Sequence, residues 1–331
     1  RIATFGSHTA VQIRRGAKDE GFETIVVGEK GKSRPYTSYG VADEIIEIDR
    51  YDDFVSIEDE LIARGAIIVP HGSFVAHLGP EIMRRIRVPH YGTKGILRWE
   101  SNRLKQRQWL TQAKLKVPKI FTRPKEIDRP VIVKTHGAAG GWGYFLARTP
   151  EEFRKKIAQR EKGIEYVIQE YIVGVPVYAH YFYSRLTREL EIMSFDRRYE
   201  SNADSIGRVA AADQITVDLT TSYTIVGNLP IVIRESLLPD FFAMGDRVVA
   251  VSQKLEPPGL FGPFCLEGVV TSDLEFYVFE ISARIVAGTN PYIQGSPYTA
   301  LKYDEPMSTG RRIAREIRMA IDRNQLQKVL G

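Results

Sequence analysis

The chain has 331 residues, of which 43% are hydrophobic and 26% charged, and its formal net charge is +5. This composition is ordinary for a globular protein and excludes a mainly disordered chain, while the length indicates two or three packed subdomains. The basic residues are scattered, without a Lys/Arg-rich run or an interleaved aromatic ladder, so we expect no nucleic-acid partner. A binding site for small anions accounts for the positive sign equally well.

No apolar run approaches the roughly 20 residues that a membrane-spanning helix needs, so we expect no membrane partner. The first residues show no basic stretch followed by an apolar segment, and no secretory signal is expected. The single cysteine, Cys265, excludes an intramolecular disulfide, and its apolar surroundings predict a buried side chain. These features favour a cytoplasmic location.

The first part of the chain alternates short apolar runs with amphipathic segments. Strands are predicted at residues 2–5, 24–27, 44–48 and 67–69, and helices at 9–19 and 57–64. This βαβ pattern predicts a parallel sheet flanked by helices. We therefore expect an α/β unit over residues 1–99.

Two of these predicted strands end in turns of small polar residues, Gly6-Ser7-His8-Thr9 and Pro70-His71-Gly72-Ser73. Ligands of open parallel sheets bind beyond the carboxyl ends of the strands, so both loops should face one crevice. His8 and Ser73 are binding candidates on that ground. The alternative is that Ser7 or Thr9 only caps the following helix.

A charged helical segment over residues 100–113 leads into Lys116-Val117-Pro118, where proline interrupts regular pairing and a second unit begins. Strands are predicted at 131–134, 143–147 and 166–171, with a helix at 150–159, which indicates an α+β unit over residues 100–190. The third unit, residues 191–331, contains predicted strands around 262–270 and 275–281 and a closing helix at 310–322.

The strand Val131-Ile132-Val133-Lys134 is followed at once by a glycine-rich stretch that includes Gly140 and Gly141. Glycines let backbone N–H groups approach an anion, and a lysine at the strand end adds a fixed positive charge. This is the chemistry of a phosphate cradle, although it matches neither the P-loop nor the GxGxxG pattern. A purely structural hairpin loop is the alternative.

About 30 residues further on, a strand over residues 167–174 carries polar groups before a glycine turn. Its residues can offer backbone N–H and C=O groups to the edge of an adenine base. An ordinary half-buried strand is the alternative for this segment.

Glu267 and Glu280 each lie inside an otherwise apolar predicted strand. Buried carboxylates are rarely left unpaired because desolvation of a charge is costly. Two of them on adjacent strands suit Mg²⁺, which prefers oxygen ligands and is typically held by one or two carboxylates plus substrate phosphates. A structural salt bridge with Arg284 is the alternative.

The order of these motifs resembles the ATP-grasp fold, preceded by an N-terminal parallel-sheet domain. Longer strings resemble the archaeal formate-dependent synthetases that make 5-formaminoimidazole-4-carboxamide ribonucleotide in purine biosynthesis. They are Gly6-Ser7-His8-Thr9, Val69-Pro70-His71-Gly72-Ser73-Phe74, Leu97-Arg98-Trp99-Glu100-Ser101, Arg198-Tyr199-Glu200-Ser201-Asn202, Ile233-Arg234-Glu235-Ser236-Leu237, Gly262-Pro263-Phe264-Cys265-Leu266 and Phe279-Glu280-Ile281-Ser282-Ala283-Arg284. The resemblance covers essentially the whole chain.

The resemblance implies a ligase with Mg²⁺ or Mn²⁺ as cofactor, in which formate and ATP give formyl phosphate. The amine of aminoimidazole carboxamide ribonucleotide (AICAR) then attacks this intermediate. It also implies a homo-oligomer. Phosphorylation gives formate a good leaving group, and cations around the transferring phosphoryl neutralise its charge.

Residue by residue, the resemblance implies that AICAR is bound by His8, Ser73 and Asn202. The ATP contacts that it implies are Arg103, Lys134, Gly140, Gly141, Gln169, Glu170, Tyr171 and Ile172. Glu267 and Glu280 are the implied metal ligands, and Lys134 and Arg284 the implied catalytic residues.

The sequence departs from the family pattern at Ala139, Trp142, Thr93, Gly95 and Gln108, where the family commonly has polar or basic residues. Each lost charge-assisted hydrogen bond weakens binding by about 1.5 to 3 kcal/mol at a desolvated site. Trp142 could stack on adenine or close an empty site. The departures leave two alternatives open: a related ATP-grasp protein with another acid or amine, or a nucleotide-binding protein without turnover.

Overall fold

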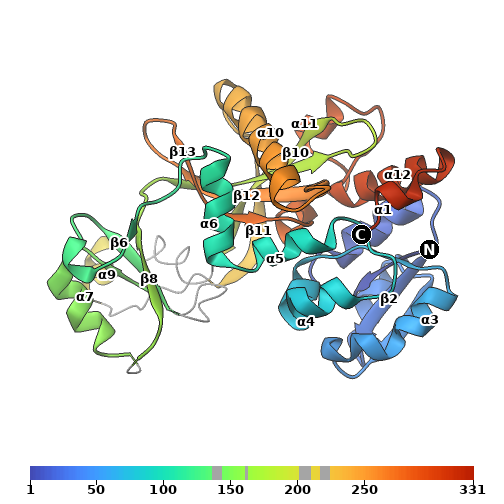
Figure 1. Cartoon of the computed structure of the whole chain (residues 1–331), viewed down its shortest axis with the longest axis horizontal. Coiled ribbons are helices and arrows are strands. Elements are labelled where there is room, and N and C mark those ends of the chain that lie inside the picture. Colours follow the sequence, from blue (N-terminus) through green and yellow to red (C-terminus); the bar gives the residue numbers. More distant parts are fainter. Residues whose placement is uncertain (136–143, 161–162, 201–209, 217–223) are drawn as a thin grey trace.

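The computed structural model describes residues 1–135, 144–160, 163–200, 210–216 and 224–331 (Figure 1). Within these ranges the strands form three sheets. Figure 1 shows the smallest unit at the left, a long antiparallel sheet in the middle and the N-terminal sheet at the right. No helix in the described part of the chain is both long enough and apolar enough to cross a membrane.

The N-terminal sheet is parallel and has the strand order β3-β2-β1-β4. Its strands are β1 (Ile2–Phe5), β2 (Thr24–Glu29), β3 (Glu44–Ile48) and β4 (Ile67–Ile68), and the surrounding helices are α1 (Ala10–Asp19), α2 (Arg34–Ser38), α3 (Glu58–Ala63) and α4 (Gly72–Arg85). The central strand β1 is buried along its whole length, as expected of a parallel strand covered on both faces. The predicted parallel sheet is confirmed.

A second, antiparallel sheet has the order β5-β8-β6-β7. It consists of β5 (Ile120–Phe121), β8 (Tyr166–Glu170), β6 (Val131–Thr135) and β7 (Tyr144–Ala147). The helix α7 (Pro150–Ile157) begins after Thr149, whose side chain accepts a hydrogen bond from the Glu152 backbone N–H, and buries Phe153 against this sheet. The unit therefore has a small core of its own.

The third sheet is antiparallel, with the order β11-β10-β9-β12-β13. Its strands are β9 (Val175–Tyr183), β10 (Leu190–Glu200), β11 (Ile225–Ile231), β12 (Gly262–Val270) and β13 (Phe276–Ser282). Sequence analysis predicted β12 and β13 but not β9, β10 or β11. Because β9 pairs with both β10 and β12, this sheet joins residues of the second and third predicted units.

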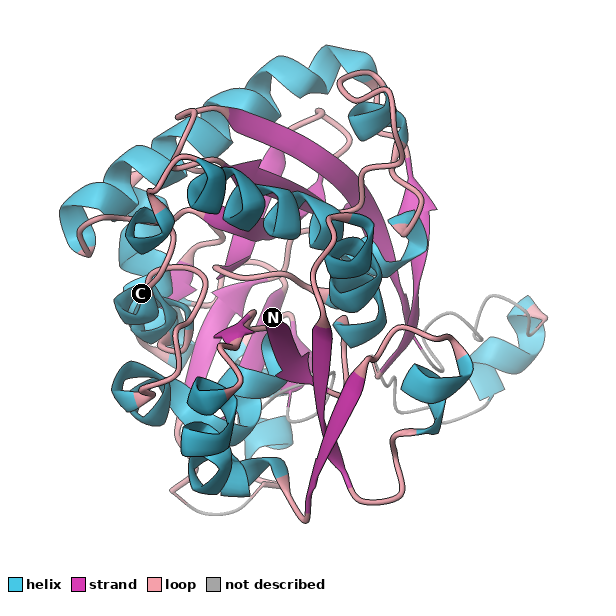
Figure 2. Cartoon of the chain, turned by 90° about the vertical axis from the view of Figure 1, so that its right-hand side faces the viewer, coloured by secondary structure: helices cyan, strands magenta, loops and turns pink. Residues whose placement is uncertain are grey.

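One face of the third sheet packs on α10 (Leu238–Leu255) and α6 (Arg103–Gln112) through a single large apolar core. Val177, Ala179 and Tyr181 of β9 point into that core, so Tyr178 and His180 must lie on the opposite face. Figure 2 shows strands, in magenta, running through the interior of the molecule with helices packed around them. The face opposite the helices is the one that carries polar residues.

The remaining elements of the described residues are helices and 3₁₀ turns. They are α5 (Leu97–Glu100), α9 (Ala211–Thr216), α11 (Pro297–Ala300), α12 (Thr309–Asp322) and the 3₁₀ turns η1 (Tyr51–Ile57), η2 (Lys94–Ile96), η3 (Pro124–Glu126), η4 (Glu235–Leu237), η5 (Ala287–Tyr292) and η6 (Leu326–Lys328). The closing helix α12 lies against α1, from the opposite end of the sequence.

Two glycines allow α1 and α12 to touch backbone to backbone. A Cβ atom on Gly16 would lie 2.1 Å from the Arg311 nitrogen, and one on Gly310 would lie 2.4 Å from the Gln12 carbonyl oxygen. The Gln12 side chain also accepts a hydrogen bond from the Gly310 N–H, at 3.0 Å. This contact fixes the N-terminal sheet against the end of the chain.

Replacing Gly16 by valine is therefore expected to destabilise the protein by about 3 kcal/mol or more, because backbone atoms cannot move aside as a flexible side chain can. Equilibrium unfolding in urea measures the change. Arg15→Val is the matched control, since it places the same β-branched residue on the exposed face of the same helix. Equal unfolding midpoints for the two variants would contradict the expectation.

Candidate functional site

A cavity of about 590 Å³ lies between the second and third sheets and reaches the N-terminal unit. A volume of this size suits a small-molecule ligand. It is lined by Gly72, Val75, Ala76, Glu100, Ser101, Arg103, Leu104, Gln106, Arg107, Leu110, Val117, Pro118, Ile120, Lys134, Val167, Gln169, Val278, Phe279, Glu280 and Arg284.

The lining of the cavity contains both apolar and charged side chains. The apolar ones are Leu110, Val117, Ile120, Val167 and Val278, and the charged ones are Glu100, Arg103, Lys134, Glu280 and Arg284. The charges of Lys134, Arg103 and Glu100 act on the pKa of Glu280, and Arg284 pairs with Glu100, so the charged set is called the charged end of the cavity. A cavity with apolar and cationic lining fits a planar base attached to phosphates.

Lys134 stands at the end of β6, where pairing with Tyr144 on one side and Val167 on the other fixes its backbone. Its ammonium nitrogen lies 5.6 Å from the centre of the Phe279 ring. Burial lowers the pKa of Lys134, and the negative charge of Glu280 opposes that shift. The lysine is thus a recessed cation beside a carboxylate.

Glu267 on β12 and Glu280 on β13 lie directly opposite each other in the strand register. Like charges in this position repel, and burial together with Glu267 raises the pKa of Glu280 to about 7. A bound cation relieves that repulsion. The described residues contain no cluster of three or more His, Cys, Asp or Glu side chains suited to a metal, so an ion here needs further ligands from a substrate.

Arg284 forms its ion pair with Glu100, at 2.9 Å between Nη2 and Oε1, and not with either of the facing carboxylates. The Ala283 backbone N–H donates to the other Glu100 oxygen at 2.8 Å. Burial raises the pKa of Glu100, and the Arg284 charge opposes this. Sequence analysis assigned no role to Glu100, although it occurs in one of the strings that carry the family resemblance.

The two polar loops of the N-terminal sheet meet, as their positions at strand ends predict. The Ser7 hydroxyl donates to the Ser73 hydroxyl at 2.7 Å. Thr9 precedes α1 but its side chain makes no capping hydrogen bond, so the helix-capping alternative does not account for this loop. His8 has a φ of 58°, which is uncommon for a residue other than glycine and marks a constrained loop.

His71 is buried and neutral. The Ser73 backbone N–H donates to its Nδ1 at 3.2 Å, so the proton resides on Nε2 and is donated to the Phe5 carbonyl oxygen at 3.2 Å. Burial lowers the pKa of His71 to about 3. Desolvation by the surrounding atoms, followed by the neighbouring His71 and the charges of Arg284 and Arg198, lowers the pKa of His8 well below its usual value, although the residue is partly exposed. Both imidazoles are therefore uncharged at neutral pH.

These loops open onto the charged end of the large cavity. Gly72 lines the cavity, and a Cβ atom at this position would lie 2.7 Å from His8 Nε2 and 3.5 Å from the Arg284 guanidinium carbon. A larger residue at position 72 would therefore displace the His8 imidazole. His8, Ser73, Arg284 and the carboxylates belong to one continuous site.

Of the four residues predicted along the adenine, Gln169 lines the cavity and Glu170, Tyr171 and Ile172 do not. The Glu170 side chain accepts the Lys119 N–H at 3.0 Å and pairs with Arg129 at 3.0 Å, which joins β8 to neighbouring segments. Arg107, which sequence analysis missed, also lines the cavity and donates to the Pro118 carbonyl oxygen at 2.7 Å. No pattern distinguishes it from other helical arginines.

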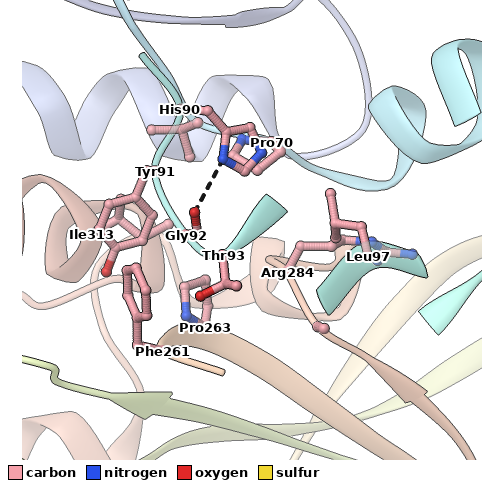
Figure 3. Close-up of a pocket in the computed structure, with 12 residues that line it drawn as sticks. Pro70, His90, Tyr91, Gly92, Thr93, Leu97, Phe261, Pro263, Arg284 and Ile313 are labelled. Atoms are coloured by element: carbon pink, nitrogen blue, oxygen red, sulfur yellow. Dashed lines mark hydrogen bonds between the residues drawn. The ribbon is translucent and has the colours of Figure 1, made fainter. Parts of the chain in front are cut away.

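Three of the residues at which the sequence departs from the family pattern lie away from the large cavity. The Thr93 hydroxyl donates to the Gly259 carbonyl oxygen at 2.6 Å, and a Cβ atom at Gly95 would lie 2.1 Å from a Glu256 carboxylate oxygen. Gln108 is exposed on α6. Figure 3 shows Thr93 and Arg284 in the wall of a smaller cavity. The predicted residues Ala139, Gly140, Gly141, Trp142 and Asn202 lie outside the described residues.

Known proteins are similar to this chain over its whole length. A family model described as a domain of unknown function, DUF1297, matches residues 145–331, and one described as a protein of unknown function, DUF1246, matches residues 2–121. The chain is 56% identical to the 5-formaminoimidazole-4-carboxamide-1-(beta)-D-ribofuranosyl 5'-monophosphate synthetase of Pyrococcus abyssi, covering 100% of this chain and 98% of that protein.

Two solved structures are similar. The crystal structure of an IMP biosynthesis protein PurP from Thermococcus kodakaraensis has a TM-score of 0.79 and 30% identity, with 100% of each chain covered. The N5-carboxyaminoimidazole synthetase of Staphylococcus aureus complexed with ADP has a TM-score of 0.62 and 16% identity, and the match covers 88% of this chain and 72% of that one. The second likeness concerns the fold alone.

Proposed function

The chain belongs to the family of archaeal 5-formaminoimidazole-4-carboxamide ribonucleotide synthetases, and from this premise we propose that it is the ATP-dependent ligase that joins formate to AICAR in purine biosynthesis. The observation that carries the proposal is 56% identity over the full length of a relative named as that synthetase. The predicted ATP-grasp fold is confirmed by the solved structures. A related protein with another acid, or one without turnover, is not favoured.

For ATP, the proposal places the base against the apolar lining residues of the large cavity and the triphosphate toward Lys134 and Arg103. The presence of both apolar and cationic side chains in the lining supports this placement. The ADP complex of the Staphylococcus aureus protein, which has a similar fold, supports the use of such a nucleotide.

Glu267 and Glu280 would hold Mg²⁺ or Mn²⁺. Two facing carboxylates, one of them with a raised pKa, suit a hard cation that completes its shell with phosphate oxygens. Such an ion, when bound, neutralises the charge that develops on the transferring phosphoryl group. Ser282 donates to Glu267 Oε1 at 3.0 Å and holds that carboxylate in place.

AICAR is proposed to bind at the loops that carry His8 and Ser73, with Asn202 as a further contact. Neutral imidazoles and hydroxyls suit the polar groups of a carboxamide ribonucleotide. Because Gly72 lets His8 approach Arg284, the amine of a ligand in these loops can reach the charged end of the cavity. Lys134 and Arg284 then act on the reacting groups.

In the reaction, a formate oxygen attacks the γ-phosphorus of ATP and ADP leaves. The AICAR amine attacks the carbonyl carbon of the resulting formyl phosphate, the carbon–oxygen bond to phosphate breaks, and the amine proton leaves with the phosphate. Fixed cations around the cavity stabilise the charge in both steps without solvent reorganisation. An enclosed site also keeps formyl phosphate from water.

We further propose a cytoplasmic homo-oligomer. The edge strand β11 exposes Ile225, Val226 and Leu229, whose exposed fractions are 44%, 61% and 43%. An apolar edge strand is a surface that a second copy can cover.

The deciding experiment measures ADP release from Mg-ATP and AICAR, with and without formate, and identifies the product by mass. We expect release that depends on all three substrates and a product heavier than AICAR by one formyl group. ADP release that does not depend on formate, or that requires another carboxylate instead, would overturn the proposed function.

A further inference from the structure

A buried arginine beside the facing carboxylates has no hydrogen-bond partner for its Nε. Arg198 on β10 keeps only 9% of its side chain exposed. Its Nη2 lies 3.6 Å from Glu267 Oε1 and its Nε lies 3.9 Å from Asp196 Oδ2, both beyond hydrogen-bond length. Among the residues that the structure describes, the charge of Arg198 is therefore balanced, but its Nε–H has no acceptor. A buried N–H without an acceptor is unfavourable unless a ligand supplies one.

The neighbouring carboxylates are already occupied by other donors. Asp196 takes His180 Nε2 at 2.7 Å on one oxygen and Asn228 Nδ2 at 2.8 Å on the other. Glu267 Oε1 accepts the Ser282 hydroxyl. These bonds hold the two carboxylates in place without Arg198, and the Arg198 Nε–H remains for another acceptor.

The position of Arg198 differs from that of the lysine beside the nucleotide cavity. In the strand register Tyr178 lies opposite Glu267 on one side and Asp196 on the other, and the Arg198 guanidinium stacks over the Tyr178 ring at 4.2 Å. The side chain thus extends from β10 back toward β12. Among the neighbouring charges, Glu280 has the largest effect on the pKa of Lys134, whereas Glu267 has the largest effect on the pKa of Arg198.

Arg198 is also near the loop proposed to bind AICAR, because its positive charge is one of those that lower the pKa of His8. It is thus near both Glu267, at 3.6 Å, and the loop that carries His8. A group held by Arg198 would lie close to the proposed metal carboxylates and to this loop.

We propose that Arg198 binds the carboxylate co-substrate and then the carbonyl oxygen of the acyl phosphate, an inference that rests on the proposed function. Its N–H groups orient one formate oxygen while the other attacks the γ-phosphorus. When the amine nitrogen then attacks the formyl carbon, the carbonyl electron pair moves onto the oxygen that faces Arg198. That pair returns as the bond to phosphate breaks, and the amine proton leaves with the phosphate. The guanidinium keeps its own protons throughout.

The test compares Arg198→Lys and Arg198→Gln with Arg197→Gln, an exposed neighbour on the other face of the same strand. We expect Arg198→Gln to raise the KM for formate at least about tenfold and to lower kcat by about 10²-fold, with the KM values for ATP and AICAR changed less than about threefold. Arg198→Lys keeps the charge but not the planar fork, so it should recover part of kcat and little of the formate KM. Arg197→Gln should behave as wild type.

Thermal melting of each variant separates catalysis from folding, and guanidinium ions added below denaturing concentration should partly restore Arg198→Gln. A lysine variant with an unchanged formate KM would reduce Arg198 to a structural counter-ion and overturn the proposal. So would a loss confined to ATP or AICAR binding. If wild-type enzyme shows no dependence on formate, the proposed function fails instead, which the first measurement of the series reveals.

Discussion

Glu280→Gln is expected to lower formate-dependent turnover by about 10³-fold while leaving the fold intact. Glu280 faces Glu267 on the neighbouring strand, and their joint negative charge is the reason why a cation site is proposed here. Glutamine keeps the shape but removes one of the two charges, so the affinity for Mg²⁺ with nucleotide should fall together with kcat. Relief of the carboxylate repulsion should leave the stability unchanged or slightly higher.

Glu275→Gln is the matched control, because Glu275 lies just before the same strand, at the far end of the hairpin, and pairs on the surface with Lys116. Mn²⁺ titration in the presence of ATP, followed by magnetic resonance, measures metal binding independently of turnover. If Glu280→Gln binds Mn²⁺–ATP as tightly as Glu275→Gln does, the assignment of the metal ligands is wrong.

The N-terminal part of the fold could be predicted because its signals are local. Apolar runs separated by amphipathic segments specify a parallel sheet, and the carboxyl ends of neighbouring parallel strands must meet at one edge. The contact between Ser7 and Ser73 follows from that rule. The strands β9, β10 and β11 gave no comparable signal, since β9 is buried on both faces over much of its length and does not alternate in hydrophobicity.

The alternating direction of side chains along a strand explains why, of the segment predicted to contact adenine, only Gln169 lines the cavity. Side chains of a strand point to opposite faces in turn, so Gln169 faces the cavity and Glu170 faces Arg129. The prediction treated four consecutive residues as one lining segment. Contacts such as that between Arg284 and Glu100 depend on residues far apart in sequence, and one sequence without an alignment carries no signal for them.

Arg284→Gln is expected to lower both kcat and stability, for two separable reasons. Loss of a fixed cation at the charged end of the cavity should lower kcat by about 10² to 10³-fold. Loss of the partner of Glu100 leaves a buried carboxylate unpaired, which should lower the free energy of unfolding by about 3 kcal/mol. The burial-raised pKa of Glu100 limits this loss, because a protonated carboxyl is easier to leave unpaired.

Adding Glu100→Gln to Arg284→Gln separates the two effects. The double variant has no buried charge to compensate, so urea unfolding should show most of the lost stability restored, while ADP release stays as low as in Arg284→Gln alone. Glu100→Gln by itself should keep more activity than either, because Arg284 remains at the cavity wall but is held less firmly. If restoring stability also restored turnover, Arg284 would be a structural residue, and Lys134 and Arg198 would remain as the proposed catalytic cations.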